Sequence, residues 1–271
     1  MTTGQPERAA GEPTTRFVDH VMGMPISLAM RGRHAGDEAG RAAWAEAMEV
    51  LRAIDRVFST YRVDSVVSRL DRGEVGLADC PPEVREVLDL AATAARDSGG
   101  AFSVHRAAPD GRIALDPSGA VKGWAAERAA AHLRALPGTD FCLSAGGDLL
   151  CRTLDADAAP WRIGIENPRD PTCLIAVVPI ATGAVATSGT AHRGAHLVDA
   201  RTGRPPAGIA SVTVVADSLT DADIDATAAY ALGRDAANWL RSRPGRTGLV
   251  VWTDGSTTCV GGPSTGLASS G

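Results

Sequence analysis

The chain of 271 residues lacks the features that would place it in a specialised class of protein. No run approaches the ~20 apolar residues that a transmembrane helix needs, so no membrane span is predicted. No segment is rich in lysine and arginine, and the formal net charge is −5. Because nucleic-acid binding depends on positive charge, we expect no nucleic-acid partner. Small molecules or other proteins are the expected partners.

Cysteine is sparse and poorly placed for a metal or redox motif. The five cysteines, at positions 80, 142, 151, 173 and 259, form no C-x-x-C pair. We therefore expect reduced, structural thiols in a reducing compartment. Residues 1–15 contain no apolar segment of the kind that an export signal requires, and the expected location is the cytoplasm.

The remaining composition is ordinary for a globular protein, with 44% apolar and 22% charged residues. The length suffices for one large domain, or two small ones, with a full hydrophobic core. Residues 1–15 and 261–271 are rich in Gly, Pro, Ser and Thr and are expected to be disordered tails. The folded part is therefore expected to span residues 16–260.

The first half of the chain carries the stronger helical signals. Residues 16–30 predict two short strands around a kink at residues 23–25. Apolar residues then recur at three- and four-residue spacing, which predicts a core-facing helix over residues 36–58. A second helix is predicted from Pro82 to the glycines at 99–100, and a third over residues 122–136.

Strand signals dominate the second half. We predict helices at 220–232 and 235–240 and strands at 141–144, 161–166, 174–180, 196–199, 211–216 and 248–253. Helices cluster early and strands late. The pattern therefore favours an α+β fold, with a mixed or antiparallel strand-rich later part, over a regular βαβ alternation.

Asp223 and Thr227 are the most informative polar pair. They lie four residues apart in a predicted helix, which places both side chains on one face. Carboxylate and hydroxyl oxygens are hard ligands that suit Mg²⁺, an ion often held by one or two protein oxygens plus substrate phosphates. The alternative is a helix cap, with Thr220 as the N-cap and Asp223 completing an imperfect capping box.

Two more aspartates of the same segment compete for this role. Asp225 is rotated by about 160° from Thr227 on an α-helix, so it is expected to face solvent. Asp221 lies in the first turn, where a carboxylate interacts favourably with the helix dipole.

A histidine lies just upstream of this helix. His196 and Asp199 flank an apolar pair on a predicted strand, and residues 202–205 predict a turn. A side-chain pKa near neutrality suits a general base, so His196 is a candidate for that role, with a positioning or plain structural role as the alternative. His192, in a predicted loop, is its rival.

Two glycine-containing segments and a lysine complete the candidates. Residues 146–148 (Gly-Gly-Asp) and 187–189 (Thr-Ser-Gly) predict tight turns whose backbone N–H groups can approach an anion. Lys122, at a predicted helix start, either neutralises phosphate charge or is simply exposed. With Asp223 and Thr227, these residues indicate metal-assisted phosphate chemistry.

The order of several motifs resembles the ApbE family, the FAD:protein FMN transferases. Along the chain these are Met-Gly-Met-Pro at 22–25, Phe-Ser-Thr-Tyr-Arg-Val-Asp-Ser at 58–65, Ser-Gly-Gly-Ala-Phe at 98–102 and Asp-Pro-Ser-Gly-Ala-Val-Lys-Gly-Trp at 116–124, then 146–148 and the stretch from 187 to 227. The resemblance runs from about residue 20 to about residue 255 and implies one ApbE-like domain.

The resemblance also implies roles for individual residues. Mg²⁺ would be bound by Asp223, Thr227 and the backbone carbonyl of Val121, and His196 and Asp223 would be catalytic. Tyr61 would stack on a flavin or adenine ring, as aromatic faces prefer. The residues that match flavin-contacting positions are Met22, Tyr61, Ala101, Phe102, Ser103, Ser118, Trp124 and Val198.

The implied reaction is Mg²⁺-dependent transfer of FMN from FAD to a Thr or Ser hydroxyl of an acceptor protein, with release of AMP. FAD hydrolysis to FMN and AMP at the same site, and a non-catalytic FAD-binding module, are the alternatives. Two departures from the family pattern suggest a compact subgroup: Ser103 stands where an aspartate is usual, and residues 104–115 are shorter than the usual insertion. Glu127 conservatively replaces an aspartate.

Overall fold

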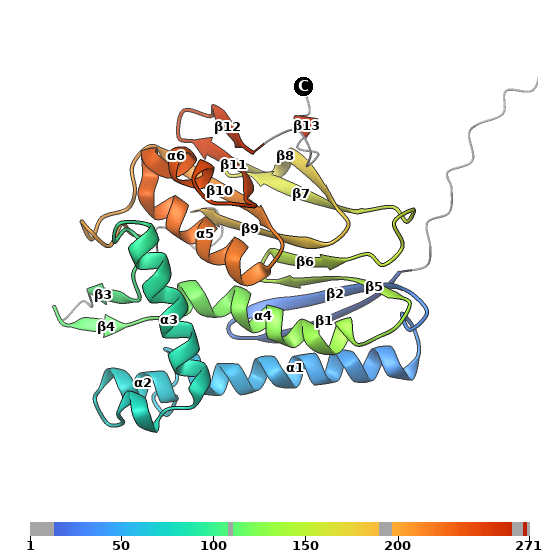
Figure 1. Ribbon diagram of the computed structural model, residues 1–271, viewed down its shortest axis with the longest axis horizontal. Helices are drawn as coiled ribbons and strands as arrows, with labels where there is room; N and C mark the ends of the chain where they lie inside the picture. Colours follow the sequence, from blue (N-terminus) through green and yellow to red (C-terminus); the bar gives the residue numbers. More distant parts are fainter. Residues whose placement is uncertain (1–13, 108–110, 190–196, 262–267, 270–271) are drawn as a thin grey trace, which may run out of the picture.

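The computed structural model describes residues 14–107, 111–189, 197–261 and 268–269. An eight-stranded, fully antiparallel sheet forms the centre of the molecule (Figure 1). In spatial order its strands are β1 (Thr15–Val21), β2 (Met24–Gly32), β5 (Thr139–Ala145), β6 (Asp148–Arg152), β9 (Gly183–Gly189), β10 (Ile209–Ala216), β11 (Thr247–Trp252) and β12 (Thr257–Val260).

Helices cover one face of this sheet. In Figure 1, α4 and α5 lie side by side across the middle of the sheet, with α1 packed along α4. The predicted stripe on α1 is buried from Ala47 to Phe58, and Asp37 caps the helix by accepting a hydrogen bond from the Gly40 N–H. The helices are α1 (Glu38–Phe58), α2 (Val66–Asp71), α3 (Pro82–Asp97), α4 (Ser118–Arg134), α5 (Leu219–Leu232) and α6 (Ala236–Arg241).

A small sheet covers the opposite face. It consists of β7 (Trp161–Asn167), β8 (Asp170–Ile180) and β13 (Ala268–Ser269) in the order β13-β8-β7. Its inward residues, among them Ile163 and Val178, form a second hydrophobic core with alternate residues of the central sheet such as Val185. A hairpin of β3 (His105–Ala107) and β4 (Ile113–Leu115) lies apart from both sheets.

The central sheet has two halves that meet at one short ladder. Residues 15–152 supply β1, β2, β5 and β6, and residues 183–260 supply β9 to β12. β6 and β9 pair through three register positions, Leu149 with Val185, Leu150 with Ala184 and Cys151 with Gly183. The next hydrogen bond along this seam runs from the Thr187 N–H to the Asp148 carboxylate at 3.0 Å. Asp148 therefore lies where the two halves join.

The predicted α+β class is confirmed, and the predicted helices agree with α1, α3, α4, α5 and α6. Two local predictions were wrong. Residues 187–189 do not form a turn but end strand β9, because their backbone pairs with β10 through residues 211–213. Leu197 and Val198 lie in no strand, and Asp199 forms only an isolated bridge with Arg204.

Most of both predicted tails lies outside the described residues. Thr15 begins β1, and Ala268–Ser269 pair with β8. Within the part of the chain that the structure describes, no helix combines the length and apolar character needed to cross a bilayer.

Candidate functional site

A cavity of about 250 Å³ opens where α4, α5 and the seam of the central sheet meet. The start of α4 contributes Ser118, Gly119 and Lys122, and α5 contributes Asp223 and Thr227. Most of the remaining wall comes from residues 101–106, the β5–β6 turn, β7, β9 and residues 197–200. The cavity therefore gathers segments that are far apart in the sequence.

Lys122 lies between two buried carboxylates at the inner end of this cavity. Its ammonium is 2.8 Å from Oδ1 of Asp223 and also contacts Oδ2 of Asp148. The side chains of both aspartates are 3% exposed, and that of Lys122 is 17% exposed. Two carboxylates thus share one ammonium, so the group has excess negative charge in a place with little water to screen it.

Glycine at position 123 allows Asp223 to reach this position. A Cβ on Gly123 would lie 2.4 Å from the Leu219 carbonyl oxygen and 2.7 Å from the Asp223 Cβ. Because that atom is missing, α5 approaches α4 closely enough for Oδ2 of Asp223 to accept a 2.8 Å hydrogen bond from the Gly123 N–H. Each Asp223 oxygen therefore has a partner on α4, one charged and one neutral.

Thr227 lies one turn further along α5, on the same face as Asp223. Its hydroxyl is 3.2 Å from that of Ser188 on β9, which ties the helix to the sheet. A Cβ on Gly119 would lie 3.3 Å from the Phe102 ring and 3.5 Å from the Thr227 methyl, so these three residues are in close contact. The cavity wall at this point joins α4, α5, β9 and the segment that follows α3.

The β5–β6 turn places Asp148. Gly146 and Gly147 have φ values of +59° and +99°, which side chains disfavour, and they connect the strands as a two-residue hairpin. The tight turn predicted at residues 146–148 is thus confirmed. The first residue after the turn is Asp148, which accepts the Thr187 N–H bond and contacts Lys122.

The start of α5 is fixed by two acceptors. Ser218 is the N-cap and accepts from the Asp221 N–H, while Glu127 on α4 accepts a 2.7 Å bond from the Leu219 N–H through Oε2. The predicted alternative, in which Thr220 caps the helix and Asp223 belongs to a capping box, was therefore wrong. Asp223 therefore takes no part in capping the helix, and it lines the cavity.

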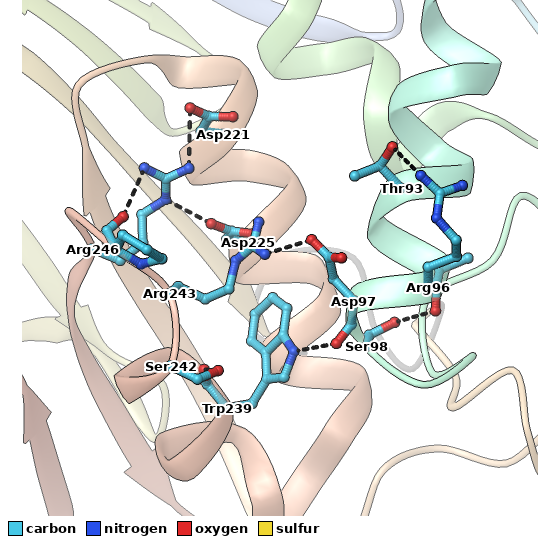
Figure 2. Close-up of polar contacts among 12 residues, drawn as sticks. Thr93, Arg96, Asp97, Ser98, Asp221, Asp225, Trp239, Ser242, Arg243 and Arg246 are labelled. Atoms are coloured by element: carbon cyan, nitrogen blue, oxygen red, sulfur yellow. Dashed lines mark hydrogen bonds and ion pairs between the residues drawn. The ribbon is translucent and has the colours of Figure 1, made fainter.

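The prediction that Asp225 faces solvent was also wrong. Asp225 is 2% exposed, and its carboxylate pairs with Arg246 Nε at 2.7 Å and Arg243 Nη2 at 3.2 Å (Figure 2). The face of α5 opposite to Thr227 is covered by α3, α6 and the residues that follow α6. Asp221, at the helix start, pairs with Arg246 at 3.0 Å.

An ion pair lies at the wall of the cavity beside the β3–β4 hairpin. Asp116 accepts a 2.8 Å bond from Arg106 and a 3.1 Å bond from the Ser118 N–H. Burial would raise the pKa of Asp116, but these bonds outweigh it, and the pKa lies below its ordinary value of 3.8. Nearby, the Ser103 hydroxyl accepts a 3.0 Å bond from the His105 N–H.

Asp199 organises a turn beside residue Ala101, whose carbonyl oxygen accepts a 3.0 Å bond from the Ala200 N–H. The Asp199 carbonyl oxygen accepts bonds from the N–H groups of Thr202 and Gly203, which confirms a turn in this region. Its carboxylate pairs with Arg201 at 2.8 Å, and this pairing lowers the pKa of Asp199. Val198 lines the cavity, whereas His196 and His192 lie outside the described residues.

Of the residues given a role by the family resemblance, the structure brings seven to the cavity: Ala101, Phe102, Ser103, Ser118, Val198, Asp223 and Thr227. The further candidates Lys122 and residues 146–148 and 187–189 also line it. Four residues given a role by the resemblance lie outside its lining. Met22 is in the β1–β2 turn, and Val121 is 3% exposed in the first turns of α4. Tyr61 is 97% exposed between α1 and α2. Trp124 is buried against Phe58, and its indole N–H donates to Glu86.

Sequence reasoning ranked two features too low and passed over a third. The sequence allowed Lys122 to be an exposed residue. It is, however, the only lysine among the 27 lysine and arginine residues of the sequence, and this rarity was a signal that could have singled it out. Gly119 and Gly123, one turn apart, signal close helix packing. The acidic residue after Gly146 and Gly147 is the second carboxylate of the Lys122 group.

Comparison with known proteins gives a consistent result. The ApbE family model matches residues 22–108 and 104–250. A Salmonella typhimurium relative described as FAD:protein FMN transferase is 29% identical over 169 residues, which cover 59% of this chain and 48% of the relative. A Rhodobacter capsulatus relative with the same description is 30% identical over 204 residues, which cover 72% of this chain and 35% of the relative. The chain thus spans about half or less of the length of these curated relatives.

Solved structures show the same fold. The ApbE protein of Thermotoga maritima superposes with a TM-score of 0.79 at 21% identity, covering 92% of this chain and 97% of that one. The flavin transferase ApbE of Vibrio cholerae gives 0.76 at 21% identity, covering 92% and 98%. With a family model that matches nearly the whole of residues 22–250, the chain belongs to the ApbE family.

Proposed function

We propose that this protein transfers FMN from FAD to a Thr or Ser hydroxyl of an acceptor protein, in a Mg²⁺-dependent reaction that releases AMP. One observation supports this most directly. Lys122, Asp148, Asp223 and Thr227 converge at the inner end of a single cavity in a chain of the ApbE family. That set combines a cation for phosphate with hard oxygen ligands for a metal ion.

The residues present fit a magnesium ion. Asp223 and Thr227 offer a carboxylate and a hydroxyl from one face of α5, and Asp148 adds a second carboxylate nearby. Among the described residues, no three His, Cys, Asp or Glu side chains form a metal-binding group. This donor set suits Mg²⁺, which takes one or two carboxylates and completes its shell with water and substrate phosphates. When bound, the ion would neutralise charge that develops on the pyrophosphate.

The chain's own residues would hold and polarise the pyrophosphate. Ser118 and Gly119, in the first turn of the 17-residue helix α4, line the cavity, where the helix dipole favours an anion. Lys122 supplies a positive charge one turn further in. The apolar wall formed by Ala101, Phe102 and Val198 suits a flat aromatic ring system.

In the proposed step, the acceptor hydroxyl oxygen bonds to the phosphorus that carries the riboflavin group, and the bond from that phosphorus to the AMP oxygen breaks. AMP leaves with the electron pair of that bond. The hydroxyl proton passes to a base, for which we propose His196 on the basis of its pKa range. His196→Ala is expected to slow transfer by roughly 10²–10⁴-fold with little loss of FAD affinity. A larger loss from His192→Ala would move the role to that residue.

The test is incubation with FAD, Mg²⁺ and candidate flavin-acceptor domains, followed by mass measurement of each protein and chromatography of the nucleotides. The proposal predicts an acceptor that has gained one FMN and an equal amount of AMP. FMN and AMP without a modified protein would identify a hydrolase instead. FAD binding without turnover would identify a binding module. Asp223→Asn is the matched control for metal-dependent turnover.

A further inference from the structure

Arg243, in the turn that follows α6, contacts α5, which lines the cavity, and the end of α3, which precedes the lining residues Ala101 and Phe102. Its Nη1 donates to Oδ2 of Asp97 at 2.5 Å, and its Nη2 is 3.2 Å from Oδ1 of Asp225. Figure 2 shows the guanidinium between the end of α3 and the middle of α5, beside the Trp239 ring. One side chain therefore links α3 to α5.

The α3 end of this link leads directly into the cavity wall. Asp97 is the last residue of α3, and its carbonyl oxygen also accepts a 2.8 Å bond from the Trp239 indole. The next residue, Ser98, is buried, and its hydroxyl accepts a 3.0 Å bond from the Phe102 N–H. The Gly100 N–H bonds back to the Ala95 carbonyl at 2.8 Å. The position of Asp97 therefore sets the position of Phe102, which lines the cavity.

The α5 end of this link leads to the cavity residues Asp223 and Thr227. Asp225 lies between Asp223 and Thr227 in sequence and points to the other side of the helix, away from the cavity. Because an α-helix is stiff over one turn, a force on Asp225 moves the two cavity residues with it. Through these two aspartates, Arg243 thus links the segment that carries Phe102 to the helix that carries Asp223 and Thr227.

We propose that Arg243 is a positioning residue for FAD binding: by joining Asp97 to Asp225, it fixes Phe102 relative to Asp223 and Thr227 in the cavity lining. The inference rests on the proposed function, because it takes FAD as the ligand of the cavity. It does not require that transfer occurs, and affinity alone is enough to test it.

Arg246 provides a matched control within the same cluster. It pairs with the same carboxylate of Asp225, through Oδ2 at 2.7 Å, and with Asp221 at 3.0 Å. Both of those aspartates belong to α5. Loss of either arginine therefore leaves Asp225 with one guanidinium, but only loss of Arg243 removes the bridge from Asp225 to the Asp97 carboxylate. The bond from Trp239 to the Asp97 carbonyl stays in both variants.

The experiment compares Arg243→Gln with Arg246→Gln in the full chain. FAD affinity is measured by titration of flavin fluorescence and stability by thermal unfolding. We expect Arg243→Gln to raise the FAD Kd by roughly 2- to 30-fold, the range for residues that couple sites without touching the ligand. The two variants are expected to lower Tm by similar amounts. Arg246→Gln, however, should change the FAD Kd by less than about twofold.

Asp97→Asn is a second variant that tests the inference if Arg243→Gln does not fold. The Asp97 side chain is 34% exposed, so its substitution should destabilise the protein less. Asp97→Asn should raise the Kd in the same direction as Arg243→Gln, and the double variant should be no worse than Arg243→Gln alone, since both remove one link. Equal Kd changes in the two arginine variants, or additive effects in the double variant, would overturn the inference. If the wild-type protein binds FAD but transfers nothing, the proposed transfer fails while this inference stands.

Discussion

Asp223 and Asp225 lie two residues apart on one helix, and each is 2% exposed, yet their surroundings differ in charge. Asp225 faces two arginines, at 2.7 and 3.2 Å. Asp223 faces one lysine, which it shares with the buried Asp148. Burial alone therefore does not distinguish a site residue from a structural one on this helix.

The difference lies in how completely each negative charge is compensated. Arg243 and Arg246 also pair with Asp97 and Asp221, but those side chains are 34% and 48% exposed, so water offsets their charges. Asp225 therefore keeps two guanidinium partners for its buried charge, with both oxygens occupied, and has no need of a further cation. Two buried carboxylates around one ammonium leave negative charge for a metal ion or for the proton of a reacting group. We infer that the face of α5 with too few cations is the functional face, and each prediction below tests that contrast.

The largest expected effect is on turnover. Asp223→Asn keeps an acceptor for the Gly123 N–H but removes the charge, so FMN transfer is expected to fall by on the order of 10²–10³-fold, as for loss of one electrostatic stabiliser. Initial rates across a Mg²⁺ titration measure this, with circular dichroism as the control for folding. Normal turnover at limiting Mg²⁺ would show that the metal assignment is wrong.

On the opposite face, the expected effect is on stability. Asp225→Asn leaves two arginines without their shared carboxylate and should lower the free energy of unfolding by about 3 kcal/mol. This is the lower end of the range for a broken buried ion pair, because the arginine side chains are 25% and 15% exposed. Urea unfolding measures it. If Asp225→Asn changed the Mg²⁺ dependence of turnover as much as Asp223→Asn does, the two faces of α5 would not differ in function.

A smaller effect is expected from the glycine that brings Asp223 to Lys122. Gly123→Ala places a Cβ within 2.4 Å of the Leu219 carbonyl, so α4 and α5 must separate, at a cost of roughly 1–3 kcal/mol. The same substitution one turn earlier, Gly119→Ala, meets the Phe102 ring at 3.3 Å and the Thr227 methyl at 3.5 Å but no backbone atom as closely, and it is the control for stability. Thermal unfolding is measured for both variants, and the prediction fails if Gly119→Ala lowers Tm more than Gly123→Ala.

The smallest effect concerns Asp116, which pairs with the partly exposed Arg106 and also accepts a bond from the Ser118 N–H. The lowered pKa of Asp116 adds stability above the unfolded-state pKa of about 3.8, and that stability is lost as pH falls through the folded-state value. Arg106→Gln should therefore cost about 1 kcal/mol or less at neutral pH and nothing once Asp116 is protonated in both proteins. Unfolding measured from pH 2 to pH 7 tests the sign. A cost that grows as the pH falls would contradict it.

The sequence predicts the parts of this molecule that depend on local pattern. The stripe on α1 and the four-residue spacing of Asp223 and Thr227 follow from the helical period alone, and both agree with the structure. The turn at Gly146 and Gly147 likewise follows from residues that tolerate positive φ.

The errors have a tertiary cause. Asp225 was expected to face solvent because a helix usually has one wet side, but α5 is covered on both sides, as its buried alanines show. Residues 187–189 resemble a turn in composition, yet the pairing of β9 with β10 overrides that preference. The partners of Lys122 come from residues 148 and 223, and no local pattern predicts which distant segments meet.

The single lysine also has a consequence for proteolysis. A lysine-specific endoprotease has one cleavage site in this chain, the bond from Lys122 to Gly123, which lies inside α4 and is packed against α5. Proteases cut extended backbone, so this bond becomes accessible only when α4 unwinds and separates from α5. The cleavage rate therefore reports how often the centre of the molecule opens, and a ligand that binds the closed form should slow cleavage in proportion to 1 + [L]/Kd.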